Sequence, residues 1–262
     1  NQKPNDLLQL LLDGHKADKA VLNDHTLASA FDETDVSMSV ANDIQKNKEN
    51  EGFSTHEIVS NAIIFFSAGY ITTTGAMSWM MYLLATHHEV QEKLSAEIEE
   101  NWPGDGKKDI SYDTICQMKY LDAVFCEVLR IFPSTQRMDR IAIRDSSIGG
   151  RFIPKGLQVN ISIWSIHHDE DYWPEPYKFD PERFMPENKH KILPQSYIPF
   201  GSGPRNCIGM RLATLEAKIA AVHLLKRFRL ERCARTEFPP NLRSQVHTAP
   251  VGGTWLKLVN RH

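Results

Sequence analysis

The segment Phe200–Gly209, with the sequence FGSGPRNCIG, constrains the fold of this chain more than any other stretch. Two glycines and a proline precede Cys207, which excludes a regular helix or strand there and predicts a tight, shaped loop. Apolar residues then recur at helical spacing at Leu212, Leu215, Ile219 and Val222. We therefore expect Cys207 where a rigid loop turns into the N-terminus of a helix.

Cys207 is a candidate functional residue because of its surroundings. The N-terminus of a helix carries partial positive charge, and Arg205 adds a cation, so the thiolate form should be favoured. A lone cysteine is more often a small buried hydrophobe, but the flanking glycines and arginine favour a metal ligand or a nucleophile. A nucleophile needs a histidine base, and the sequence indicates none, so the metal ligand leads. Gly203 would let the backbone approach something flat, and Gly209 would let the helix pack close beneath it.

This loop resembles the haem-binding loop of the cytochrome P-450 (haem-thiolate) superfamily, F-x-x-G-x-R-x-C-x-G. The chain matches that pattern at Phe200, Gly203, Arg205, Cys207 and Gly209. The resemblance implies that Cys207 is the axial thiolate ligand of the iron of haem b, and that Arg205 pairs with a haem propionate. It also implies a fold class that is mainly α with small antiparallel β-sheets, the C-terminal, haem-binding half of the cytochrome P-450 fold.

The most apolar run of the chain begins at Ser54. Ser54 and Glu57 form a capping box, and no Lys, Arg, Asp or Glu occurs between Glu57 and Glu89. A transmembrane helix has to be considered for such a run. Small polar side chains are scattered around all its faces, which is typical of a fully buried central helix, and we favour that interpretation.

Inside this helix, Ala68 and Thr72 lie four residues apart on one face, with Gly69 leaving a notch beside them. Plain packing of small residues is an equally good interpretation of these residues alone. Beside the cysteine loop they resemble the oxygen-binding helix of the same superfamily, [AG]-G-x-[DE]-T-[TS]. The resemblance implies that Thr72, Ala68 and Gly69 are catalytic, with Thr72 handling oxygen and protons. Ile71 stands where the family usually has an acid, and isoleucine cannot relay a proton.

An amphipathic surface helix is predicted from Glu89 to Trp102, and a second helix from about Tyr112 to Ile131. Glu127 and Arg130 lie three apart, opposite the apolar stripe of the second helix, which alone indicates a solvated ion pair. Their E-x-x-R pattern, however, resembles the family's buried pair beneath the haem. Arg183, in a P-E-R-F segment, would be its third member, and a carboxylate shared by two arginines could tolerate burial.

After the second helix, apolar residues recur at every second position, a pattern that predicts strands. Arg137–Ile143 and the alternating residues from Leu157 to Ile163 are strand-like, and Gly149-Gly150 predicts a hairpin turn. The turn at 245–248 precedes a further predicted strand, Trp255–Val259.

Two histidine pairs, His87-His88 and His167-His168, raise the question of a metal site. Adjacent histidines point in different directions on any regular element, so we interpret both pairs as surface residues.

The resemblance assigns further roles. Arg140 would meet the other propionate, and Glu127, Arg130 and Arg183 would support the haem loop. The substrate pocket would be bordered by Phe65, Ser67, Ile71, Ser134, Thr135, Gln136, Val246 and His247.

The composition fits this picture. A net charge of −3 over 262 residues gives no indication of nucleic-acid binding, and the four cysteines lack the spacing of a disulfide framework or zinc site.

Residues 1–53 are expected to form a short helix, Asp6–Leu12, and a long, mobile polar loop. Residues 54–262 would be the haem-binding part of a single catalytic domain. The family is roughly twice this length, so its N-terminal half and membrane anchor are expected to be missing, and no signal peptide is recognised.

The sequences of these motifs most resemble those of the animal microsomal branch that contains family 3 and thromboxane synthase. This implies a monooxygenase that inserts one oxygen atom from O2 into a lipophilic substrate (a steroid, fatty acid or xenobiotic). Electrons would come from NADPH through a flavoprotein reductase, with cytochrome b5 as a further partner, at the cytoplasmic face of the endoplasmic reticulum membrane. Two alternatives stay open: a haem-thiolate isomerase of lipid peroxides, motivated by Ile71, and a catalytically silent partial chain.

Overall fold

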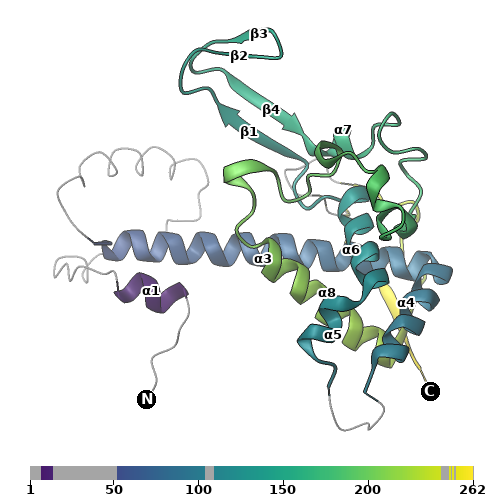
Figure 1. Cartoon of the computed structure of the whole chain (residues 1–262). Coiled ribbons are helices and arrows are strands. Elements are labelled where there is room, and N and C mark those ends of the chain that lie inside the picture. Colours follow the sequence, from purple (N-terminus) through teal and green to yellow (C-terminus); the bar gives the residue numbers. More distant parts are fainter. Residues whose placement is uncertain are drawn as a thin grey trace. The chain divides into compact units, whose positions relative to one another are not determined.

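A computed structural model of the chain describes residues 7–13, 52–103, 109–242, 248, 250 and 252–261 (Figure 1). The chain divides into two units, Asn1–Ala68 and Gly69–His262, and the boundary falls within one long helix. The predicted division at residue 53 stays a prediction. Apart from Gly52, the polar loop predicted from His15 to Gly52 lies outside the described residues.

The described chain is mainly helical with small antiparallel sheets, which confirms the predicted fold class. Its helices are α1 (Leu7–Asp13), α3 (Thr55–Thr86), α4 (His88–Asn101), α5 (Tyr112–Gln117), α6 (Lys119–Ile131), α7 (Ile163–His167) and α8 (Met210–Arg227). Its strands are β1 (Arg137–Ile141), β2 (Ser146–Ile148), β3 (Arg151–Ile153), β4 (Gln158–Ser162), β5 (Phe228–Arg232) and β6 (Leu256–Asn260). Short 3₁₀ turns are η3 (Pro181–Phe184), η4 (Lys189–Lys191), η5 (Pro194–Ser196) and η6 (Gly203–Arg205).

Helix α3 begins at the predicted capping box. The Ser54 N–H donates to Glu57 Oε2 at 2.8 Å, and the Glu57 N–H donates to Ser54 Oγ at 3.3 Å. These two bonds satisfy donors that the first turn of a helix cannot pair internally. The hydrogen bonds that the Ser54 N–H and the Ser54 hydroxyl donate to Glu57 Oε2 hold the pKa of the Glu57 carboxyl below its usual range.

The two halves of α3 differ in burial. In the C-terminal half, Trp79 and Met80 are at most 1% exposed, and Trp79 stacks on Phe132 with ring centroids 3.9 Å apart. In the N-terminal half, Ile63 is 46% exposed and Ile64 is 63% exposed. The prediction of a helix buried along its whole length is therefore wrong for the N-terminal half, because an apolar surface is buried only where another segment covers it.

Helix α3 is long and apolar enough to cross a membrane, judged by length and composition alone. Its C-terminal half, however, forms the protein core together with α4, α6 and α8. We therefore describe only the C-terminal half of α3 as part of the core.

The helix predicted from Tyr112 to Ile131 is wrong in one respect, because the structure breaks it into α5 and α6. Met118 between them is extended, with φ −68° and ψ 108°. The Glu97 carboxylate, from α4, accepts hydrogen bonds from the N–H groups of Tyr120 and Leu121, each at 2.8 Å. A carboxylate from another helix thus replaces the side-chain cap that α6 lacks locally.

In the part of the chain that the structure describes, three two-stranded antiparallel sheets accompany the helices. Strand β1 pairs with β4, and β2 pairs with β3 through the predicted turn, where Gly149 and Gly150 have φ of 57° and 76°. Both values lie in the left-handed region that favours glycine. The β2–β3 hairpin extends beyond the β1–β4 pair (Figure 1). The alternating strand ends at Ser162 and not at Ile163, because Ser162 Oγ accepts from the Ser165 N–H and caps α7.

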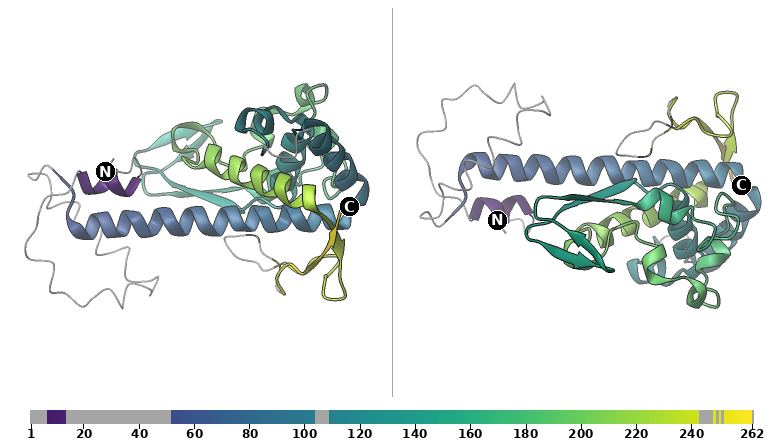
Figure 2. Two further views of the ribbon diagram at one scale, coloured as in Figure 1. Left: turned by 90° about the horizontal axis from the view of Figure 1, so that it is seen from below. Right: turned by 90° about the horizontal axis from the view of Figure 1, so that it is seen from above.

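The third sheet pairs β6, which was predicted within a residue, with β5, which was not predicted. Buried Gln91 ties this sheet to α3: its amide nitrogen donates to the carbonyls of Leu84 and Leu230, and its oxygen accepts from the Leu230 N–H. Both views in Figure 2 accordingly place the yellow C-terminal strand by the end of α3 that enters the core. A side chain far away in sequence therefore decides where β5 lies.

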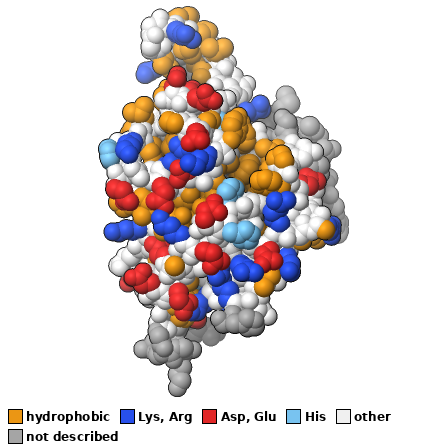
Figure 3. Space-filling model, turned by 90° about the vertical axis from the view of Figure 1, so that its right-hand side faces the viewer, with side chains coloured by type: hydrophobic (Ala, Val, Ile, Leu, Met, Phe, Trp, Pro, Cys, Tyr) orange, Lys and Arg blue, Asp and Glu red, His pale blue; other side chains and the backbone are white. Residues whose placement is uncertain are grey.

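Acidic and basic side chains are interspersed over the face shown in Figure 3. Helix α4 is joined by ion pairs to three distant segments, and these pairs are Lys93–Glu182, Glu99–Lys226 and Glu92–Arg261. Exposed pairs of this kind contribute little to stability individually.

Candidate haem-thiolate site

The cysteine loop is closed by its own backbone. The Cys207 N–H donates to the Phe200 carbonyl at 2.8 Å, and the Gly201 N–H donates to the Ile198 carbonyl at 3.0 Å. Gly201 has a φ of 75°, and a Cβ there would lie 3.1 Å from Met138 Sδ on β1. A side chain at residue 201 is therefore opposed both by the backbone conformation and by the close approach of β1.

The Cys207 thiol is exposed, two residues before Gly209, which is the N-cap of α8. A Cβ at Gly209 would lie 3.9 Å from Cys207 Sγ, so glycine keeps the space beside the sulfur open. Gly203 has a φ of 76° and no atom within 4 Å of an added Cβ. The glycines therefore leave both the backbone and the sulfur accessible to a flat group.

Around the thiol, large apolar side chains are exposed: Ile208 at 87%, Leu212 at 61% and Met210 at 38%. Arg205 and Arg140 are exposed as well. An accessible thiol flanked in sequence by exposed apolar side chains, with two exposed arginines on the same unit, fits an apolar, planar group that carries carboxylates. The described residues contain no group of three or more His, Cys, Asp or Glu that could hold a metal ion.

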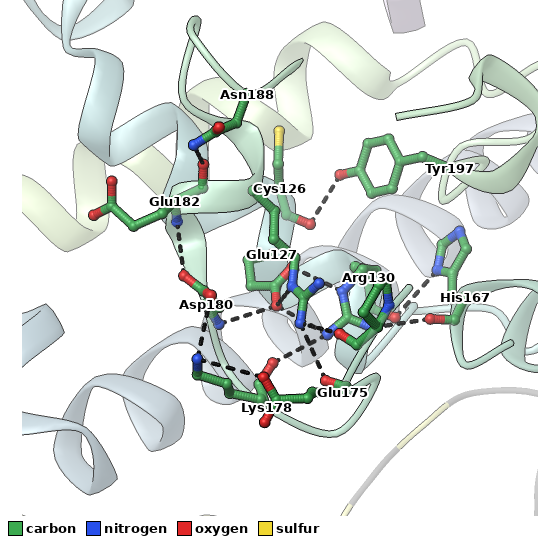
Figure 4. Close-up of polar contacts among 12 residues, drawn as sticks. Cys126, Glu127, Arg130, His167, Glu175, Lys178, Asp180, Glu182, Asn188 and Tyr197 are labelled. Carbon is green, nitrogen blue, oxygen red and sulfur yellow. Dashed lines mark hydrogen bonds and ion pairs between the residues drawn. The ribbon is translucent and has the colours of Figure 1, made fainter. Parts of the chain in front are cut away.

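Glu127 and Arg130 on α6 form a fully buried ion pair (Figure 4). Arg130 Nε donates to Glu127 Oε2 at 2.7 Å, and Nη2 donates to Oε1 at 2.8 Å. Arg130 also donates to the carbonyls of His167 at 2.9 Å and Lys178 at 3.3 Å, and it lies over the Trp173 ring. The pair is buried, as the family resemblance implied, and not solvated as the periodicity of α6 suggested.

Arg183 completes this cluster from η3. Its Nε lies 3.6 Å from Glu127 Oε1, an ion pair without a hydrogen bond, and its Nη2 donates to the carbonyls of Pro174 and Glu175. The Asp180 N–H donates to Glu127 Oε1 at 3.1 Å. Burial raises the pKa of the Glu127 carboxyl, and the hydrogen bonds from Arg130 oppose that shift.

The prediction that His167 is a surface residue is wrong. Its side chain is fully buried, whereas its neighbour His168 is partly buried and stacks on Trp164. His167 Nε2 accepts from the Ile198 N–H at 3.0 Å, and Nδ1 donates to the Arg130 carbonyl at 3.2 Å. Sequence alone contained one usable signal: with Ser162 as a helix cap, Ile163 and His167 lie at i and i+4 on one face.

The chain just before the cysteine loop is anchored at three consecutive residues. Trp173 Nε1 donates to the Ser196 carbonyl at 3.2 Å, and the Tyr197 hydroxyl donates to the Cys126 carbonyl at 3.0 Å. The third anchor is the bond from Ile198 to His167. Residues from α6, α7 and the loop after α7 therefore fix where the cysteine loop begins.

The structure also brings Thr72 and the start of β1 together. Ser134 Oγ donates to the Thr72 carbonyl at 3.2 Å, and Gln136 Nε2 lies 3.5 Å from Thr248 Oγ1. The hydroxyl of buried Thr248 donates to the Pro133 carbonyl at 2.7 Å, and the backbone carbonyl of Thr248 accepts from Trp79 Nε1 at 2.9 Å. Thr248 was not singled out in the sequence, although it ends the predicted pocket-facing turn.

The remaining pocket assignments concern residues of other segments. Val246 and His247 lie outside the described residues, and Ile71 is 47% exposed. Phe65 and Ser67, together with Ala68 of the predicted catalytic group, belong to the unit Asn1–Ala68. Their roles stay predictions.

Comparison with known proteins identifies the family. The family model described as Cytochrome P450 matches residues 1–256. The chain belongs to the cytochrome P450 family. Family membership implies a haem iron with a thiolate ligand, which agrees with an exposed cysteine on a glycine-rich loop.

Individual relatives of the cytochrome P450 chain come from family 3. It is 46% identical to cytochrome P450 3A13 of Mus musculus over 217 residues, which is 82% of this chain and 43% of the mouse protein. It is 44% identical to cytochrome P450 3A29 of Sus scrofa over 220 residues, 83% of this chain and 43% of the pig protein. The chain thus spans less than half the length of the relatives it matches.

Proposed function

We propose that this cytochrome P450 chain is the haem-binding part of a monooxygenase, with Cys207 as the thiolate ligand of haem iron. The observation that carries the proposal is the exposed Cys207 thiol on a glycine-shaped loop whose start is anchored to the buried Glu127–Arg130 pair. When bound, the haem would supply oxygen activation, and the thiolate would favour O–O cleavage. One oxygen atom would enter the substrate and the other would leave as water.

The residues of the chain have separate roles in this proposal. Cys207 holds the iron, while Arg205 and Arg140 offer cations to the two propionates. Glu127, Arg130 and Arg183 hold the loop in place. Thr72 lies on α3, the helix that meets the segment before β1. Its hydroxyl would donate and accept protons beside the bound substrate.

The exposed apolar side chains beside the site favour a lipophilic substrate. Electrons would come from NADPH through a flavoprotein reductase, with cytochrome b5 as a second donor, at the endoplasmic reticulum membrane. The relatives from family 3 support this setting by family resemblance.

Ile71 favours a second candidate, a haem-thiolate isomerase of lipid peroxides. Isoleucine cannot supply protons at the position where the family usually has an acid, and rearrangement of a peroxide needs no external electrons. Product formation from a lipid peroxide without NADPH would favour the isomerase. Hydroxylation that depends on NADPH and reductase would favour the monooxygenase.

The first test is the absorption spectrum of the full chain, expressed with haem, reduced and exposed to carbon monoxide. We expect a strongly red-shifted Soret band that is lost in Cys207→Ser. Cys116→Ser is the matched control, because Cys116 is also an exposed cysteine but lies on α5. A red-shifted band that survives Cys207→Ser, or no band in the parent, would contradict the proposed site.

A further inference from the structure

His167 occupies an unusual position for a histidine. Its ring is buried between α6 and the chain that leads into the cysteine loop, and it makes a hydrogen bond on each side. The Ile198 backbone N–H can only donate, so His167 Nε2 must accept. The proton of the neutral ring therefore sits on Nδ1, which donates to the Arg130 carbonyl.

Backbone hydrogen bonds connect the position of Ile198 to that of Cys207. The Ile198 carbonyl accepts from the Gly201 N–H at 3.0 Å, and the Phe200 carbonyl accepts from the Cys207 N–H at 2.8 Å. A shift of Ile198 would therefore move the turn that closes on the cysteine.

The same residue also reaches the buried ion pair. The His167 carbonyl accepts from Arg130 Nη1 at 2.9 Å, while its ring donates to the Arg130 carbonyl. Two reciprocal bonds thus lock His167 to Arg130, and the third bond, to Ile198, leads to the loop. Figure 4 shows His167 and Arg130 side by side, with the two reciprocal bonds between them dashed.

We propose that His167 is a positioning residue, which sets the place of the Cys207 thiol by linking Arg130 to Ile198. The inference rests on the proposed haem-thiolate function, because it says how that site is held. Nothing in it requires His167 to touch the haem or the substrate.

The chemistry of the imidazole explains why this residue type suits the position. One rigid ring supplies a donor and an acceptor on opposite sides, which a phenyl ring of similar size cannot do. Protonation of Nε2 would destroy the acceptor. Burial lowers the pKa of His167 to about 3, so the acceptor persists at neutral pH.

The test compares the full chain with His167→Phe, which removes both side-chain bonds, and His167→Gln, whose amide keeps a donor and an acceptor. His168→Phe is the matched control, because His168 is adjacent and bonds only to the Trp164 carbonyl among its recorded hydrogen bonds. The first readout is amide hydrogen exchange at Ile198, Gly201 and Cys207, which needs no haem. The second is the fraction of reduced, carbon-monoxide-bound haem with the red-shifted Soret band.

We expect His167→Phe to speed exchange at these amides by about tenfold or more, since a buried N–H loses its acceptor at a cost equivalent to that factor. The thiolate-ligated fraction should fall as well. His167→Gln should restore part of both, and His168→Phe should match the parent.

Parent-like exchange and an unchanged thiolate fraction in a folded His167→Phe variant would overturn the proposal. If that variant does not fold, His167→Gln and His167→Met decide, because they match in length but differ in hydrogen bonding. Equal exchange in these two would also overturn it. If the parent binds no thiolate-ligated haem, the proposed function fails, whereas the exchange comparison still decides whether His167 positions the loop.

Discussion

At the residue scale, the cost of burying charge dominates the site. Glu127 and Arg130 are both fully buried, so each depends on the other for compensation of its lost hydration. The arginine satisfies two carbonyls in addition to the carboxylate, which is why its guanidinium can be tolerated between α6 and the loops that pack on it.

Replacing Glu127 with Gln leaves the Arg130 charge buried without its anion. We expect Glu127→Gln to lower the free energy of unfolding by about 3–5 kcal/mol, measured by urea denaturation. Glu99→Gln is the control, because Glu99 pairs with Lys226 at the surface, and its effect should stay below about 1 kcal/mol. Equal effects of the two substitutions would argue against a stability role for the buried pair.

His167 makes the stability of the protein depend on pH. Burial and, to a smaller degree, nearby Arg130 and His168 lower the pKa of His167 to about 3, against about 6.5 in an unfolded chain. As the pH falls from 6.5 toward 3, the unfolded chain binds the proton first. The contribution of His167 is therefore complete above pH 6.5 and is lost on acidification through this window.

Between pH 7.5 and 5.5 we expect the parent to lose up to about 1.4 kcal/mol more unfolding free energy than His167→Gln, whose side chain does not titrate. Denaturation curves at the two pH values measure this difference. Identical pH dependence of the two proteins would contradict a neutral, buried His167.

At the element scale, helix ends are decided by both local and distant groups. The capping box of α3 is local, and the sequence shows it directly. The N-terminus of α6 has no side-chain cap of its own, and Glu97 from α4 accepts two of its N–H groups instead. For this reason the break at Met118 could not be predicted from the residues around it.

Glu97→Ala should therefore destabilise a helix that does not contain residue 97. We expect a loss of about 1–2 kcal/mol, the usual cost of removing an N-terminal cap, together with faster exchange of the Tyr120 and Leu121 amides. Glu100→Ala, an exposed site on the same helix, is the control. Unchanged exchange at these two amides in Glu97→Ala would show that the carboxylate is not their acceptor in solution.

At the scale of the whole molecule, a few side chains join segments that are far apart in sequence. The Thr248 hydroxyl donates to the Pro133 carbonyl, the Trp79 indole donates to the Thr248 carbonyl, and the Gln91 amide bonds to both α3 and β5. These polar side chains are buried and satisfied, so they specify how the C-terminal segment lies against the helices.

Thr248→Val keeps the shape of the side chain and removes the hydroxyl. The buried Pro133 carbonyl then loses its donor, and we expect unfolding to become easier by about 1–3 kcal/mol, measured by thermal or urea denaturation. Thr74→Val is the control, since the exposed Thr74 hydroxyl bonds only to carbonyls of its own helix in the recorded contacts. If Thr248→Val destabilises the protein no more than Thr74→Val does, the bond from the Thr248 hydroxyl to the Pro133 carbonyl does not stabilise the fold.

The sequence by itself determined the local features of this protein. The capping box at Ser54, the turn at Gly149-Gly150 and the helix after the cysteine loop depend on neighbouring residues, and the structure confirms them. The motif around Cys207 indicated the family by resemblance, and the match to the family model confirms it.

Only the tertiary structure decided burial. The periodicity of α6 suggested a solvated Glu127, the composition of α3 suggested burial throughout, and adjacent histidines suggested a surface position for His167. Each inference failed for the same physical reason: the exposure of a side chain depends on which distant segments pack over it.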